Sequence, residues 1–127
     1  MEKDIENFHR LERSKDLDIL LERIGHSQFV LLGEASHGTS EFYIWRSEIS
    51  KRLINEKGFS FIAVEGDWPE CYKINRYIKG FPDSGKNAYD VLYSFNRWPT
   101  WMWANKEMVE LVEWLKLYND KQQEQNH

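Results

Sequence analysis

Two short, uninterrupted apolar runs constrain the fold of this chain more than any other feature of its sequence. The runs are QFVLLG (28–33) and FSFIAVEG (59–66), and a glycine ends each of them. Runs of this length bounded by glycine are typical of strands buried on both faces. The segment between them, from Thr39 or Ser40 to Gly58, has the apolar spacing of an amphipathic helix. The pattern therefore predicts a right-handed parallel βαβ unit in an α/β fold.

The rest of the chain is predicted to be mainly helical. Capping residues and apolar spacing predict further helices at 14–25, 69–80, 90–95 and 105–118. RWPTWMW (97–103) is predicted to be a non-regular aromatic stretch, and a polar tail begins at about residue 119. Two strands are few for so many helices, because parallel strands occur in sheets of several. Either strands are hidden in the ambiguous segments, or the chain is part of a larger α/β domain, which is the interpretation we favour.

Composition excludes several classes of function. The formal net charge is −4 and the pI is near 5.6, so no basic surface for nucleic acid is expected. No apolar run approaches the ~20 residues of a membrane span, and the first residues lack the apolar core of a signal peptide. Cys71 is the only cysteine, which rules out an internal disulfide and a cysteine-based zinc site. We expect a soluble cytoplasmic protein of one domain at most.

Both predicted strands end beside a glutamate. Glu34 follows the first run, and Glu65 lies at the end of the second, next to Gly66. Ligands of open α/β sheets bind outside the carboxyl ends of the strands, so neighbouring strands would place the two carboxylates side by side. A carboxylate that follows an apolar run is costly to bury without a partner. We therefore expect Glu34 and Glu65 to belong to a functional site.

Two basic side chains are candidates for the same site. His37 lies three residues after Glu34 in GEASHG (33–38), and an imidazole oriented by a carboxylate can accept a proton from water. It is equally compatible with a loop residue that hydrogen-bonds a backbone carbonyl. Arg46 lies near the apolar stripe of its helix, where it would either extend along the rim or face the carboxylates or a substrate oxygen.

Other chemistries have weaker support. Ser36 lies in G-x-x-S-x-G and not in the G-x-S-x-G nucleophile elbow, so we interpret it as a turn residue. The three tryptophans of 97–103 would line an apolar cleft or, more commonly, pack in the core. Four residues have side chains suited to a metal, but no recognised ligand spacing supports that alternative: Glu34, His37, Glu65 and Asp67.

Three motifs in this order give the chain a resemblance to a known family. They are GEASHG (33–38), EGDW (65–68) and PTWMW (99–103). The region from roughly Phe8 to Tyr118 that contains them resembles the erythromycin esterase family. The resemblance implies a three-layer α/β/α fold with a parallel sheet. Family chains are much longer, so residues 1–127 would be the incomplete N-terminal portion of such a domain.

The resemblance also implies an activity. The best-studied members of the family confer macrolide antibiotic resistance by hydrolysing the macrolactone ester, without a required metal or other cofactor. In those enzymes the histidine of the first motif is taken as the base that activates water, and the resemblance implies this role for His37. The glutamate of the first motif corresponds to Glu34, and the arginine of the following helix corresponds to Arg46. A carboxylate found in some members corresponds to Glu65.

The resemblance leaves part of the site outside this chain. Family members contribute a further catalytic histidine from their C-terminal portion, and the only later histidine here is His127, to which we do not assign that role. A complementing C-terminal chain or domain would supply it, and this chain alone is expected to be inactive. The alternative function is non-catalytic: a truncated or split-gene product that binds a ligand or a partner.

Overall fold

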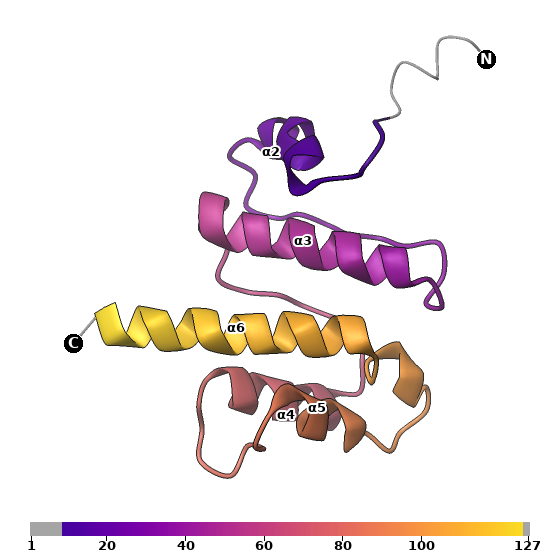
Figure 1. Cartoon of the computed structure of the whole chain (residues 1–127), viewed down its shortest axis with the longest axis vertical. Helices are drawn as coiled ribbons and strands as arrows, with labels where there is room; N and C mark the ends of the chain where they lie inside the picture. The colour runs from indigo at the N-terminus through magenta and orange to yellow at the C-terminus, as the bar shows by residue number, and fades with distance from the viewer. Residues whose placement is uncertain (1–8, 126–127) are drawn as a thin grey trace. The chain divides into compact units, whose positions relative to one another are not determined.

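The computed structural model describes residues 9–125, and these belong to two compact units. The first unit contains residues up to Gly33 together with Glu48–Phe61, and the second contains Glu34–Ser47 and the residues from Ile62 onward. Within the described range every regular element is helical (Figure 1). The elements are η1 Ser14–Leu17, α2 Asp18–Ile24, α3 Ser40–Lys57, α4 Trp68–Ile78, α5 Ala88–Tyr93, η2 Thr100–Met102 and α6 Lys106–Gln125.

The predicted α/β fold, with its parallel sheet between helical layers, is wrong for residues 9–125. Neither apolar run forms a strand, and both are connections without regular structure. Their side chains are not buried on two faces: Phe29 is 85% exposed, Leu31 96% and Phe61 78%. A strand needs a backbone partner on at least one side, and the described chain gives these runs none. The apolar pattern alone does not distinguish a buried strand from an unpaired connection.

The helical predictions are largely confirmed. α2 ends at Gly25, and α3 is followed by Gly58, whose φ of +73° suits a residue without a side chain. Asn105 caps α6, because its Oδ1 accepts a hydrogen bond from the backbone N–H of Met108 at 2.9 Å. The predicted polar tail is instead helical as far as Gln125. His127 lies outside the described residues.

The first unit is held by polar contacts to one arginine on the C-terminal part of α3. Arg52 Nη1 lies 2.8 Å from Asp18 Oδ1 and donates a hydrogen bond of 2.8 Å to the carbonyl of Ser14. Its Nε also pairs with Glu56 at 2.6 Å. These contacts raise the pKa of Arg52 above its ordinary value, chiefly through the hydrogen bonds that it donates to Glu56. The arginine thus ties η1 and α2 to α3.

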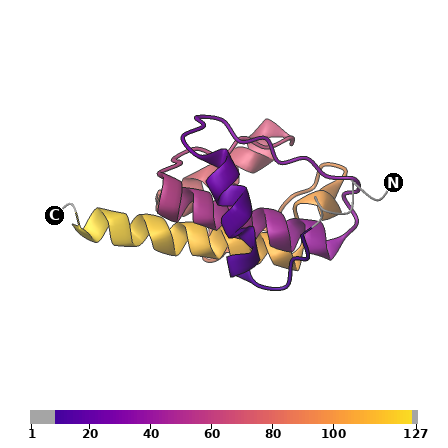
Figure 2. The ribbon, with the colours of Figure 1, turned by 90° about the horizontal axis from the view of Figure 1, so that it is seen from above.

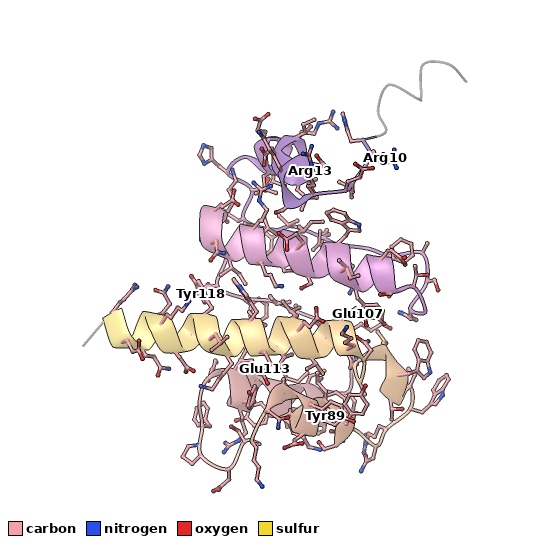
Figure 3. All side chains as sticks on the ribbon, in the orientation of Figure 1. Arg10, Arg13, Tyr89, Glu107, Glu113 and Tyr118 are labelled. Atoms are coloured by element: carbon pink, nitrogen blue, oxygen red, sulfur yellow. The ribbon has the colours of Figure 1, made fainter. Side chains whose placement is uncertain are left out.

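The second unit has its core where α4, α5 and α6 pack together (Figures 1 and 2). Glu113 of α6 connects all three helices and lies between the ribbons in Figure 3. Its carboxylate accepts hydrogen bonds from Tyr77 Oη at 3.0 and 3.1 Å and from the backbone N–H of Ala88 at 2.6 Å. The buried core residues around it are Tyr77, Ala88, Val91, Leu92, Phe95, Met102, Trp103 and Val112. No helix within residues 9–125 is long and apolar enough to cross a membrane.

Candidate functional site

Three of the residues expected at the site meet in the second unit. Glu34 is central: His37 Nδ1 lies against its Oε1, and Arg46 Nη1 donates to its Oε2 at 2.5 Å. The Glu34 side chain is only 14% exposed. Its Oε2 accepts the hydrogen bond from Arg46, whereas the close approach of His37 Nδ1 to Oε1 lacks the geometry of a hydrogen bond. Glu34 therefore lies between the Arg46 guanidinium, whose hydrogen bond it accepts, and the His37 imidazole.

Short-range contacts shape the loop that carries His37. Ser36 Oγ accepts a hydrogen bond from the backbone N–H of Gly38 at 3.1 Å, which confirms Ser36 as a turn residue. The carbonyl of His37 accepts a hydrogen bond of 2.8 Å from the hydroxyl of Tyr43, in the first turn of α3. Further along the chain, Ser40 at the start of α3 donates to Glu107 at the start of α6. The loop and the beginning of α3 are therefore fixed to one another and to α6.

A pocket of about 470 Å³ opens beside His37 in the same unit. Its walls come mainly from the EGDW motif and from residues 95–103, so two of the quoted motifs build one cavity. The His37 ring lies 6.3 Å from the ring of Trp101, centroid to centroid, and is tilted by 59°. The lining residues are His37, Glu65, Gly66, Asp67, Glu70, Phe95, Arg97, Trp98, Pro99, Trp101, Met102 and Trp103.

Gly66 is a point of close contact between those two motifs. A Cβ atom at this position would lie 2.7 Å from Cys71 Sγ and 3.0 Å from Trp103 Nε1. Both distances are shorter than ordinary van der Waals contacts. Trp103 is 7% exposed and belongs to the core cluster, so its indole has little room to shift. A side chain at position 66 would therefore force Cys71 or Trp103 to shift.

The acidic side chains of the pocket differ in their pairing. Asp67 Oδ1 accepts from Arg97 Nη1 at 3.0 Å, and Glu70, which is buried, accepts from Lys73 Nζ at 2.6 Å. Glu65, by contrast, is exposed. Cys71 lies on α4 near Asp67 and Glu70, and its pKa is raised by burial and then by the negative charges of these two neighbours. The thiol therefore stays protonated at neutral pH.

The expected site residues are thus brought together only in part. Glu34, His37 and Arg46 are in direct contact, whereas Glu65 shares a pocket with His37. Arg46 faces Glu34 and is not among the residues that line the pocket. Within residues 9–125, no group of three or more His, Cys, Asp or Glu side chains is arranged to hold a metal ion.

Sequence reasoning missed Arg97 and Tyr43, and it considered Asp67 only as a candidate metal ligand. Asp67 and Arg97 form an ion pair on the pocket wall, although 30 positions separate them. Each lies inside or beside a motif that the sequence singles out, but a contact over that separation leaves no local pattern. Tyr43 holds the carbonyl of His37 and has no distinguishing signal, because it is one of several aromatic residues at the start of α3.

Comparison with known proteins identifies a family for the C-terminal part of this sequence. The family model described as erythromycin esterase matches residues 54–127, a segment that includes Glu65 but not Glu34, His37 or Arg46. A protein of Escherichia coli named erythromycin esterase type II is 33% identical over 72 residues, which are 57% of this chain and 17% of that relative. The chain therefore matches only a small part of the relative's length. The search of solved structures found no significant match. Because the family model matches more than half of its residues, the chain belongs to the erythromycin esterase family.

Proposed function

We propose that this chain carries the water-activating part of a carboxylic ester hydrolase site, with His37 as the general base. The observation that carries the proposal is the position of one ring. His37 Nδ1 lies against the Glu34 carboxylate while the residue also lines the pocket. When Nδ1 is engaged by a carboxylate, the other ring nitrogen, Nε2, is the one that can take a proton from water.

Each residue of the site has a role in this mechanism. Glu34 orients the imidazole and stabilises its charged form, and Arg46 fixes Glu34. Glu65 lines the same pocket as His37 and would contribute a negative charge there. Of the two arginines, Arg97 rather than Arg46 lines the pocket and is placed to face a substrate oxygen.

The reaction then follows general base catalysis. Water gives one proton to His37 while its oxygen attacks the ester carbonyl carbon, which forms a tetrahedral oxyanion. The oxyanion collapses, the bond to the alcohol oxygen breaks, and the imidazolium returns the proton to that oxygen. One ester and one water thus give one carboxylic acid and one alcohol.

The substrate class is proposed from the family and from the pocket walls. The Escherichia coli relative is named for an esterase that acts on erythromycin, which points to a macrolactone-type ester here. Trp98 and Trp101 present exposed ring surface at the pocket, and Phe95, Pro99 and Met102 add apolar area. The volume of about 470 Å³ lies within the range of ordinary small-molecule sites.

We further propose that a complementing C-terminal chain or domain completes the site. The support is the alignment, since the matched segment is 17% of the relative's length. A chimera in which this chain replaces the corresponding segment of the Escherichia coli relative tests this. It is screened against macrolides and simple esters by mass spectrometry, where hydrolysis adds the mass of one water. Hydrolysis by the folded chimera supports the proposal, and a folded chimera that leaves every ester intact refutes it.

The second candidate function is a non-catalytic ligand-binding module. It is favoured by the observation that the pocket is lined wholly by residues of the second unit. Titration of the chain with a macrolide, followed by tryptophan fluorescence, measures binding, and loss of the signal change in Trp98→Phe or Trp101→Phe assigns it to the pocket. This alternative would be supported over hydrolysis if the chain and the chimera both bind the macrolide saturably and neither hydrolyses it.

A further inference from the structure

We infer that Tyr43 is a positioning residue that holds the backbone of His37, so that the imidazole stays between Glu34 and the pocket. The inference concerns the geometry of His37, and its consequence for hydrolysis rests on the function proposed above. Tyr43 would not touch substrate and would act only through His37.

The geometry places two clamps on one face of α3. Tyr43 and Arg46 are three residues apart, and the Arg46 guanidinium carbon lies 5.9 Å from the centroid of the Tyr43 ring. The arginine holds the Glu34 side chain at 2.5 Å, and the tyrosine hydroxyl donates to the His37 carbonyl at 2.8 Å. One helical face therefore fixes both the carboxylate that orients the ring and the backbone from which the ring extends.

The surroundings of Tyr43 suit this role. Its side chain is 8% exposed, and the loop it holds, residues 34–39, has no helix or strand to fix its carbonyls. Burial, and then the negative charge of Glu34, raises the pKa of the Tyr43 hydroxyl above its ordinary value. The hydroxyl therefore remains protonated, and remains a donor, over the whole pH range in which an imidazole titrates.

The test removes one oxygen and watches His37 directly. In Tyr43→Phe the ring is kept and the hydroxyl is lost, and the ¹⁵N spectrum of the histidine side chains reports which ring nitrogen carries the proton. The His37 signals are assigned by their loss in His37→Gln. We expect the wild-type chain to hold the Nδ1–H form that faces Glu34, and Tyr43→Phe to shift toward the Nε2–H form favoured by free histidine. An unchanged ratio overturns the inference.

A matched control separates positioning from loss of stability. Tyr77 is also buried, at 6% exposed, and its hydroxyl also makes a hydrogen bond, to Glu113 in the core. Tyr77→Phe should destabilise the chain at least as much, yet leave the His37 tautomer unchanged. A tautomer shift of equal size in Tyr77→Phe would mean that Tyr43 has no specific role.

A measurement on the wild-type chain covers the case in which Tyr43→Phe fails to fold. In an equal mixture of H₂O and D₂O, a hydroxyl that exchanges slowly gives two ¹³Cζ signals for its tyrosine. We expect two signals for Tyr43, whose hydroxyl is buried and bonded to the His37 carbonyl. A single averaged signal would refute a stable hydrogen bond without the need for any variant.

The activity measurement then links the geometry to catalysis. In the chimera, Tyr43→Phe is expected to lower kcat by roughly 10-fold to 100-fold with little change in KM, because the base is misplaced while the pocket is intact. A rise in KM with unchanged kcat would contradict a positioning role. If the chimera hydrolyses no ester but the tautomer shifts as expected, the proposed function fails and the inference about Tyr43 stands.

Discussion

Replacement of Gly66 by alanine tests the close packing between the two motifs of the pocket wall. The new Cβ would lie 2.7 Å from Cys71 Sγ and 3.0 Å from Trp103 Nε1. Favourable contacts between heavy atoms lie at roughly 3.5–4.0 Å, so the shorter one is about 1 Å too close. Overpacking of this kind costs about 1–3 kcal/mol. We expect Gly66→Ala to lower the free energy of unfolding by about 2 kcal/mol.

The two contacts separate in a double-mutant cycle. Cys71→Ala removes the sulfur and relieves the shorter contact, while the contact with the buried Trp103 indole remains. In the Cys71→Ala background, Gly66→Ala should therefore lower the free energy of unfolding by only about 1 kcal/mol. The difference from the wild-type background is a coupling energy of about 1 kcal/mol between positions 66 and 71. Urea denaturation followed by circular dichroism measures all four free energies.

Gly33→Ala is the matched control, because a Cβ at Gly33 would meet no atom within 4 Å. This substitution should change the free energy of unfolding by less than about 0.5 kcal/mol. The reasoning is refuted if Gly66→Ala is as neutral as Gly33→Ala. It is also refuted if Gly66→Ala costs the same with and without the Cys71 sulfur.

Three further predictions concern the same unit. Glu113→Ala leaves the Tyr77 hydroxyl and the Ala88 N–H without their acceptor. Urea denaturation should therefore show that the free energy of unfolding falls by about 3 kcal/mol. A fall of less than about 1 kcal/mol would contradict the role of Glu113. Burial raises the pKa of Tyr77 from 10.0 to about 12, so the contribution of this shift to stability is complete below pH 10 and is lost as the pH rises toward 12. The free energy of unfolding of Tyr77→Phe should therefore fall less steeply between pH 10 and pH 12 than that of the wild type. An equally steep fall in both proteins would argue against this role of Tyr77. The raised pKa of Cys71 should make its alkylation by iodoacetamide slow at pH 8, and Asp67→Asn should accelerate it by lowering that pKa; equal rates in both proteins would show that Asp67 does not act on the thiol.

The helices could be predicted because their signals are local. Asn105 caps α6, Gly58 follows α3, and Pro69 lies in the first turn of α4, and each of these acts within one turn of its own position. Strands depend on partners far away in the sequence. Phe29 and Leu31 have the composition of a buried strand but lie exposed in a connection, since no backbone partner pairs with them in the described chain.

The candidate site divides in the same way. The contact between Glu34 and His37 spans three residues and is predicted from GEASHG. Arg46 lies 12 residues after Glu34, on the helix that follows this loop. The ion pair between Asp67 and Arg97 and the pocket they line depend on how α4 and residues 95–103 pack, which no local pattern encodes. Glu65 is predicted at the site because of a sheet edge, and residues 9–125 form no sheet. It nevertheless lines the pocket, because it lies next to Gly66, which packs against Trp103.

The most direct test of the central claim is the rate at which the chimera opens a macrolactone when His37 is replaced. His37→Ala should lower kcat by at least about 100-fold, the size of effect expected for loss of a general base, while the circular dichroism spectrum stays that of the folded protein. His26→Ala, at an exposed histidine of the first unit, should keep the full rate. A folded His37→Ala protein that opens the ring as fast as His26→Ala would contradict the account.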